Sequence, residues 1–244
     1  MLNPILKDKL RASMIHFVLS SILALLCFIL IFFLLYPTPL AQATGVENLF
    51  FLMLAIDVVL GPALTFIVYK KYKKTLKMDL LIIVIIQLSA LIYGIYAMYK
   101  GRPVWIAYTA DRFELIRAND MIGQDPNYPL PKIKPQYIFV ETNPKNPKEQ
   151  LNMMLKEAQS NISPAQQPQY YRPITQATTQ IQQRALSIAE LQQYNSKVAV
   201  EKTLVKYPKA DAWLPLKATA VDMVVLVNKE TASIIKIVDL RPWE

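Results

Sequence analysis

Residues 54–62 of the chain read LAIDVVLGP and place one carboxyl group, that of Asp57, inside a long apolar run. An ionised carboxyl group at the centre of a bilayer costs several kcal/mol unless another group pairs with it. For this reason an acid at such a depth is a functional-site hypothesis by default. The run therefore indicates a membrane protein with a polar feature among its helices.

Working outward from this run, the chain contains three segments that are long and apolar enough to cross a bilayer as helices. They cover residues 14–36, 49–69 and 78–99, and about 20 apolar residues are needed for one crossing. The rest of the chain has the composition of a soluble domain that is large enough to bury its own core. We therefore predict an α-helical membrane domain of three transmembrane helices over residues 1–100, followed by a soluble α+β domain over residues 101–244.

The basic residues predict the orientation of these spans. The segment before the first span and residues 70–77 carry all eight Lys and Arg residues that precede Lys100, whereas residues 37–48 carry none. Cytoplasmic loops are enriched in Lys and Arg, so the N-terminus and the 70–77 loop are expected in the cytoplasm and residues 101–244 on the other side. The 70–77 loop can also contact anionic lipids.

A competing interpretation makes the first apolar run a cleaved signal peptide, because residues 41–43 read AQA, as at a small-residue cleavage site. The apolar core of a signal peptide has roughly 7–15 residues. The run over residues 14–36 is longer than that, which favours a retained membrane span.

The soluble part shows alternating strand and helix patterns. Residues 104–109 alternate with the period of a β-strand, and a turn at residues 110–112 leads into residues 113–116. A further element is expected at residues 137–141, after the prolines at positions 126, 129, 131 and 135. A helix is predicted over residues 148–159, with Asn146 as its N-cap and an apolar stripe formed by Leu151, Met154, Leu155 and Ala158.

Three further elements are predicted in the C-terminal part. The Gln- and Pro-rich residues 161–183 indicate a surface loop or a loosely held segment. A single helix is expected over residues 188–206, ended by Pro208. Residues 221–227 and 233–240 resemble the two strands of a hairpin.

The chain offers little chemistry for catalysis or cofactor binding. His16 is the sole histidine and lies near the expected cytoplasmic end of the first span, so the soluble domain has no Ser-His-Asp or Cys-His pairing and the chain has no His-rich metal cluster. Cys27 is the sole cysteine, so no internal disulfide can form. Five glycines leave no Gly-rich phosphate loop. We predict no catalytic residues, cofactor or metal, no small-molecule substrate, and no enzyme. The 19 basic and 14 acidic residues from Lys100 onward are well mixed, which argues against nucleic-acid binding.

The membrane half instead offers faces for helix packing. Asp57, Gly61 and Thr65 share one face of the second span, and small residues there allow another helix to approach closely. Pro62 cannot donate a hydrogen bond to the Val58 carbonyl, so the helix is expected to kink and leave that acceptor free. On the third span the matching stripe contains Gln87, Ala90, Gly94 and Ala97, and on the first span it contains Ser13, His16, Ser20, Ala24 and Cys27.

Two interpretations of these faces stay open. At 1.5 Å per residue, Asp57 lies about 18 Å and Gln87 about 14 Å from the cytoplasmic ends of their helices, so a slight tilt brings them together. In the first interpretation Asp57 is protonated or bonded to Gln87, Tyr93 or the first span, and holds a three-helix bundle together. In the second, part of the polar face stays open for a transmembrane helix of a partner.

Residues 57–65, which read DVVLGPALT, resemble a motif of the type IV pilin accessory proteins, the TfpX/TfpZ family. The resemblance continues at residues 77–80, 87–94, 102–104 and 111–113, and it covers residues 14–117 most specifically. Residues 168–173 and 240–242 extend it loosely into the C-terminal half.

The resemblance implies a non-enzymatic accessory protein or chaperone of the bacterial inner membrane that serves one cognate major pilin. Its C-terminal domain is then periplasmic. The residues expected to bind the partner or pack helices are Asp57, Gly61, Pro62, Thr65, Gln87, Ala90, Tyr93 and Gly94.

Two alternatives come from other classes of protein. One is a membrane-anchored periplasmic sensor or ligand-binding protein, although the predicted cytoplasmic segments are too short for an enzymatic output domain. The other is a subunit that assists pilin glycosylation indirectly.

Overall fold

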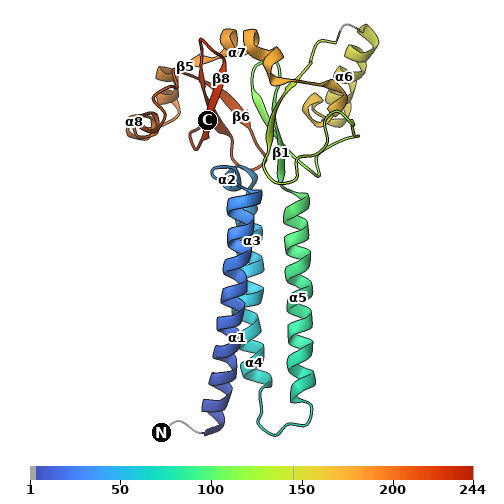
Figure 1. Cartoon of the computed structure of the whole chain (residues 1–244), viewed down its shortest axis with the longest axis vertical. Helices are drawn as coiled ribbons and strands as arrows, with labels where there is room; N and C mark the ends of the chain where they lie inside the picture. The colour runs from blue at the N-terminus through green and yellow to red at the C-terminus, as the bar shows by residue number, and fades with distance from the viewer. Residues whose placement is uncertain (1–3, 145, 244) are drawn as a thin grey trace. The chain divides into compact units, whose positions relative to one another are not determined.

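The computed structural model describes residues 4–144 and 146–243 (Figure 1). By its internal contacts the chain forms two compact units. The first comprises Met1–Leu35 and Val46–Lys100, and the second comprises Tyr36–Gly45 and Gly101–Glu244.

The first unit contains the three predicted spans, each long and apolar enough to cross a membrane. The chain is therefore a membrane protein with three long apolar helices in its N-terminal region, as predicted. The first span consists of α1 (Pro4–Ile29) and the π-helical η1 (Leu30–Leu35), the second of α3 (Val46–Leu54), π-helical η2 (Ala55–Leu60) and α4 (Gly61–Val68), and the third of α5 (Leu76–Lys100).

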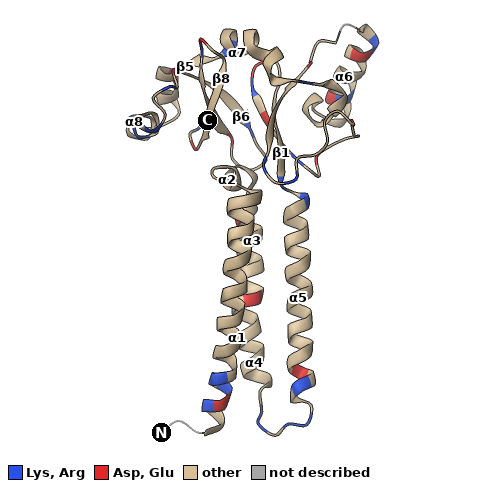
Figure 2. Cartoon of the chain, in the orientation of Figure 1, with Lys and Arg blue, Asp and Glu red and all other residues tan. Residues whose placement is uncertain are grey.

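The helices extend beyond the predicted spans at the end that carries the basic residues. Helix α1 begins at Pro4 rather than at Met14, so Lys7, Lys9 and Arg11 lie on its first turns. Figure 2 shows these basic residues at the same end of the unit as the α4–α5 loop. An ion pair of 3.1 Å between Lys71 and Asp8 joins the loop to α1.

The second span lies between the other two. Helix α1 packs along α4, and α5 packs against α3 and α4, whereas α1 and α5 contact each other little. Aromatic rings fasten the far ends of the first two spans, since the Phe50 ring lies 5.9 Å from that of Phe28 and 5.2 Å from that of Phe32. Gly94 lets Met53 pack directly on the α5 backbone, because a Cβ at residue 94 would lie 2.9 Å from the Met53 sulfur.

The second unit is α+β, as predicted, and is built on one mixed sheet with the strand order β4-β3-β1-β2-β6-β7-β8, while β5 pairs with β6. Figure 1 shows α6 and α8 near opposite edges of this sheet. The strands are β1 (Pro103–Tyr108), β2 (Phe113–Arg117), β3 (Gln136–Val140), β4 (Tyr171–Arg172), β5 (Leu186–Ser187), β6 (Ala212–Lys217), β7 (Met223–Asn228) and β8 (Ser233–Val238). The helices are α2 (Leu40–Thr44), α6 (Pro147–Ser160), α7 (Thr178–Arg184) and α8 (Lys197–Lys206), with 3-10 turns η3 (Pro164–Gln166), η4 (Pro168–Tyr170), η5 (Ile174–Ala177) and η6 (Ile188–Gln193).

Alternation along β1 divides the core between the two faces of the sheet. Ile106 and Tyr108 pack into a cluster with Phe113 and Leu214, whereas Trp105 packs on the other face with Tyr171. Such alternation is the consequence of a side-chain period of two along a strand.

Three sequence-based predictions for this unit need correction. The segment 161–183 is not a loosely held loop, since it buries Tyr170, Tyr171 and Ile181 in the core. The predicted helix over residues 188–206 is two elements, η6 and α8, separated where Ser196 caps α8. Helix α6 has the predicted Asn146 cap but buries Met153, while the predicted apolar stripe is exposed. The exposed stripe residues are Leu151, Met154, Leu155 and Ala158.

Strand β6 was not predicted, because Pro215 lies in its middle and proline lacks the N–H of a sheet ladder. The structure accommodates Pro215 because no strand is paired with this residue along one edge of β6. On one side of β6, β5 pairs with Ala212 and Trp213, and β2 pairs with Leu216 and Lys217, so neither strand is paired with Pro215.

The loop between the first two spans belongs to the second unit. Leu40 and Ala43 are buried in its core. The Ala43 carbonyl accepts hydrogen bonds from the amides of Ala220 (2.9 Å) and Val221 (3.3 Å). Residues 41–43, which resemble a cleavage site in the sequence, lie in helix α2 with both alanines buried, which is unlike the exposed loop tips where proteases cut.

Candidate intramembrane groove

Asp57 lies in the π-helical segment η2, and the sequence explains why regular α-helical bonding stops there. Pro62 has no amide hydrogen, so the Val58 carbonyl loses its usual donor four residues later. The Gly61 amide instead donates to the Ile56 carbonyl, five residues back. π-Helical turns are rare and occur often at functional sites. Figure 2 shows the single acidic band in the interior of the second span.

Gln87 reaches the second span from α5 and depends on Gly61 to do so. Its Nε2 donates a hydrogen bond of 3.1 Å to the backbone carbonyl of Asp57. A Cβ at residue 61 would lie only 2.1 Å from this Nε2. The Gln87 side chain therefore occupies the space that any side chain at residue 61 would need.

Polar side chains of α1 bind the same span on its other side. Ser13 Oγ donates to the Pro62 carbonyl at 2.9 Å, and His16 Nδ1 and Thr65 Oγ1 are hydrogen-bonded at 2.6 Å. The polar stripe of the first span thus holds α1 against α4.

Between α1 and α5 lies a groove of about 180 Å³ with Asp57 and Gln87 among its lining residues. Asp57 is 6% exposed and Gln87 8% exposed. In the described part of the chain, Asp57 Oδ1 and Gln87 Oε1 have no hydrogen-bond partner. The remaining lining residues are His16, Leu19, Ser20, Leu23, Val84, Leu88 and Leu91. We call this feature the intramembrane groove.

The structure places the predicted site residues in different surroundings. Asp57, Gly61, Pro62, Thr65, Gln87 and Gly94 are buried, and Ala90 is half-buried. Tyr93 is 73% exposed, whereas Asp57 is 6% exposed. The sequence predicted His16 and Ser20 only as members of the polar stripe on the first span, and it did not predict that they line a groove with Asp57 and Gln87.

The second unit contains a separate cavity of about 480 Å³ at the ends of β1 and β3. Glu114 of β2 lines it, and burial raises the pKa of this carboxyl group despite a hydrogen bond of 2.8 Å from Ser163 Oγ and the nearby charge of Lys217. Tyr108 is the last residue of β1, and burial raises its pKa to about 12. Among the described residues, no three His, Cys, Asp or Glu side chains gather as a metal site requires.

Comparison with known proteins identifies relatives over most of the chain. A family model described as fimbrial assembly protein FimB matches residues 4–45. The fimbrial assembly protein of serogroup I from Dichelobacter nodosus is 32% identical over 234 residues, which cover 90% of each chain. The serogroup E1 protein of the same organism is 30% identical over an equal extent. The protein of serogroups C1 and C2 is 41% identical over 114 residues, which are 46% of this chain and 87% of that protein. No solved structure matches the chain.

These relatives agree with the resemblance to type IV pilin accessory proteins that residues 57–65 indicate. The similarity to the serogroup I protein extends through both units rather than through the membrane spans alone. The chain belongs to the family of fimbrial assembly proteins.

Proposed function

We propose that the protein is an accessory protein or chaperone that binds a cognate major pilin in the bacterial inner membrane and promotes its stability or its assembly into pili. Membership in the fimbrial assembly family supports the role in pilus assembly. The observation that carries the proposal of pilin binding is the intramembrane groove, because a membrane-bound pilin presents one hydrophobic helix and a globular head.

The groove suits a helix that is already in the membrane. The walls of the groove are apolar, so an apolar helix can pack against them. They are formed by Leu19 and Leu23 of α1 and by Leu88 and Leu91 of α5. Helices associate in lipid through van der Waals packing and through polar contacts, since lipid tails are as apolar as leucine. Both kinds of contact are offered at the groove.

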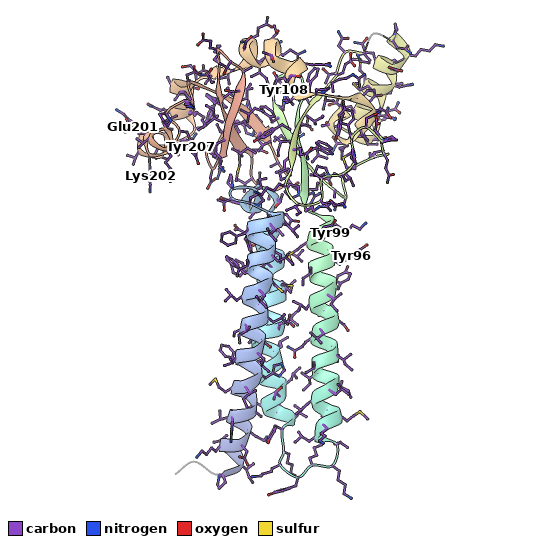
Figure 3. The ribbon with its side chains drawn as sticks, viewed as in Figure 1. Tyr96, Tyr99, Tyr108, Glu201, Lys202 and Tyr207 are labelled. Atoms are coloured by element: carbon purple, nitrogen blue, oxygen red, sulfur yellow. The ribbon has the colours of Figure 1, made fainter. Side chains whose placement is uncertain are left out.

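We propose that α1 begins in the cytoplasm and that the second unit is periplasmic, on the same side as the pilin head. The basic residues at one end of the spans support this orientation. At the other end of α5, Tyr96 and Tyr99 project outward, as Figure 3 shows, and Lys100 Nζ lies 5.7 Å from the Tyr96 ring centre. Tyrosine is enriched at membrane–water interfaces.

The orientation is tested with reporters fused after residue 244. We expect an alkaline phosphatase fusion to be active, because this enzyme folds in the periplasm, and a green fluorescent protein fusion exported through the same route to be dark. Fluorescence with no phosphatase activity would place the C-terminus in the cytoplasm and exclude contact with a pilin head.

Pilin binding is tested by purifying the full-length protein in mild detergent from cells that express the pilin of its own strain. We expect this pilin to co-purify, and a pilin of another serogroup or an unrelated single-span protein to be lost on washing. The proposal is wrong if the cognate pilin is absent from the purified material and if pili assemble normally in cells that lack this protein.

A further inference from the structure

Two buried oxygen atoms at the base of the intramembrane groove lack hydrogen-bond donors, and they indicate what kind of helix the groove takes. We infer that the groove receives a transmembrane helix that carries a hydrogen-bond donor at the depth of Asp57. This inference rests on the proposed function and specifies the chemistry by which the pilin helix is recognised.

No group in the described part of the chain donates a hydrogen bond to either oxygen. The Gln87 amide nitrogen is already bonded to the Asp57 carbonyl, which leaves Gln87 Oε1 and Asp57 Oδ1 as acceptors without partners. On α1, His16 Nδ1 is bonded to Thr65 and Ser13 to the Pro62 carbonyl, and the groove-lining Ser20 is bonded to neither oxygen. A polar atom without a partner is strongly disfavoured in hydrocarbon, because no water is present to bond it.

The surroundings of the two oxygens fit a helix better than a soluble ligand. Five of the nine residues that line the groove are Leu or Val, from α1 and α5. All of these except Leu91 are also exposed on the unit's surface, which in a membrane faces lipid. An occupant therefore has an apolar body that reaches the groove from within the bilayer, and it carries one polar group toward Asp57.

The arrangement gives specificity as well as affinity. A site whose polar groups are left unpaired discriminates strongly against an analogue that lacks the matching group. We therefore expect the groove to favour a helix with a hydroxyl, amide or amino group at this depth over one that is apolar there. The acceptors Asp57 Oδ1 and Gln87 Oε1 set that preference, and Gly61 keeps Gln87 in place.

The inference is tested in the full-length protein with a photo-reactive amino acid at Leu88, a groove wall, and at Ile86 of the same helix as the control. Ile86 is 62% exposed and does not line the groove. We expect crosslinking of the cognate pilin from position 88 and not from position 86. The crosslinked pilin residue then identifies the depth at which the donor lies.

Removing the acceptor should weaken capture, whereas an isosteric acceptor should keep it. We expect Asp57→Ala to lower the yield of the position-88 crosslink about tenfold, the effect of losing one hydrogen bond of about 1.4 kcal/mol. Asp57→Asn retains an acceptor oxygen and should keep most of the yield. Expression level and thermal unfolding in detergent report whether each variant folds.

A partner-side substitution keeps the test decisive if Asp57→Ala does not fold. We expect replacement of the pilin's polar residue at the crosslinked depth by Leu to lower the yield to a similar extent, with this protein unaltered. The inference is overturned if crosslinking from position 88 is unchanged in a folded Asp57→Ala variant, or if the pilin helix is apolar at that depth. Pilin that co-purifies without any position-88 crosslink also overturns it and leaves the proposed function standing, whereas pilin that neither crosslinks nor co-purifies rejects both.

Discussion

At the scale of single residues, the contact between Gly61 and Gln87 decides how closely α5 approaches the second span. The Gln87 amide group fills the space beside the Gly61 Cα and bonds to the Asp57 carbonyl. The glycine is required here for close approach, since its φ of −59° is an ordinary helical value.

We expect Gly61→Ala to lower the free energy of unfolding by about 1–3 kcal/mol, the usual cost of overpacking, because the new methyl group overlaps Gln87. Thermal unfolding of the detergent-solubilised protein measures this. In a Gln87→Ala background the overlap is absent, so the cost of Gly61→Ala should fall. Equal costs in the two backgrounds would show that the two residues do not interact.

Glu114 gives the second unit a pH dependence whose sign follows from its environment. Burial raises the pKa of this carboxyl group, so the folded state holds the proton to a higher pH than the unfolded state does. Folding stability from this group is therefore greatest below the ordinary pKa of glutamate and falls as the pH rises through the raised pKa.

We expect Glu114→Gln to remove this loss of stability and to unfold at a higher temperature than the unaltered protein at neutral pH. Near pH 4 the two proteins should differ little, because the glutamate is then largely protonated in both states. Thermal unfolding of the full-length protein between pH 4 and 8 measures the difference. A constant difference across this range would contradict the explanation.

At the scale of elements, the π-helical segment η2 links the local sequence to the groove. Pro62 deprives the Val58 carbonyl of its α-helical donor, and the extra residue in the turn helps to set the direction of Asp57. The regular α-helical hydrogen bonding of the second span is therefore interrupted where the groove is formed, and such local irregularities are common at functional sites.

We expect Pro62→Ala to raise the free energy of unfolding, by at most about 3 kcal/mol, because residue 62 regains its amide hydrogen and a helix-compatible side chain. The same change should lower the capture of pilin at position 88, because a regular α-helix turns Asp57 away from its present direction. Thermal unfolding and crosslink yield measure the two effects. Pro129→Ala, in an exposed loop, is the control and should alter neither.

Elements whose own sequence carries the signal were predicted from it, and those stabilised by distant contacts were not. Length and hydropathy revealed the three spans, and the Asn146 cap and alternating residues revealed α6 and the β7–β8 hairpin. Segment 161–183 was misjudged because its Gln-rich composition indicates solvation, while Tyr170, Tyr171 and Ile181 are buried by partners elsewhere in the unit.

The candidate site was only partly predictable for a similar reason. Helical spacing puts Asp57, Gly61 and Thr65 on one face, and all three are buried on it. At about 100° per residue, Tyr93 lies about 120° around α5 from Gln87, which explains its exposure. The hydrogen bond from Gln87 to the Asp57 backbone depends on how the helices pack, and no pattern within one span specifies it.

At the scale of the whole molecule, the two units share the chain in an interleaved order. The second unit takes its α2 segment from between the first and second spans and the remainder from after the third. Ala43 is fully buried there, and its carbonyl binds the amides of Ala220 and Val221.

We expect Ala43→Leu to destabilise the second unit by about 1–3 kcal/mol, because a larger side chain does not fit a closely packed position. Amide hydrogen exchange at Ala220 and Val221 should accelerate in this variant. Thr38→Ser, at an exposed position of the same loop, should leave the exchange rates unchanged. Unaltered exchange in Ala43→Leu would show that the loop is not part of the folded unit.

The interleaving of α2 with the later chain also constrains biogenesis. The ribosome synthesises Leu40 and Ala43 long before Ala220. Helix α2 therefore cannot form its contacts with residues 220 and 221 until two more spans have been synthesised and inserted. A gene fragment that begins after the third span would therefore yield a protein with a hole where α2 belongs. Supplying residues 36–45 as a tethered peptide should fill that hole and restore a native soluble fragment.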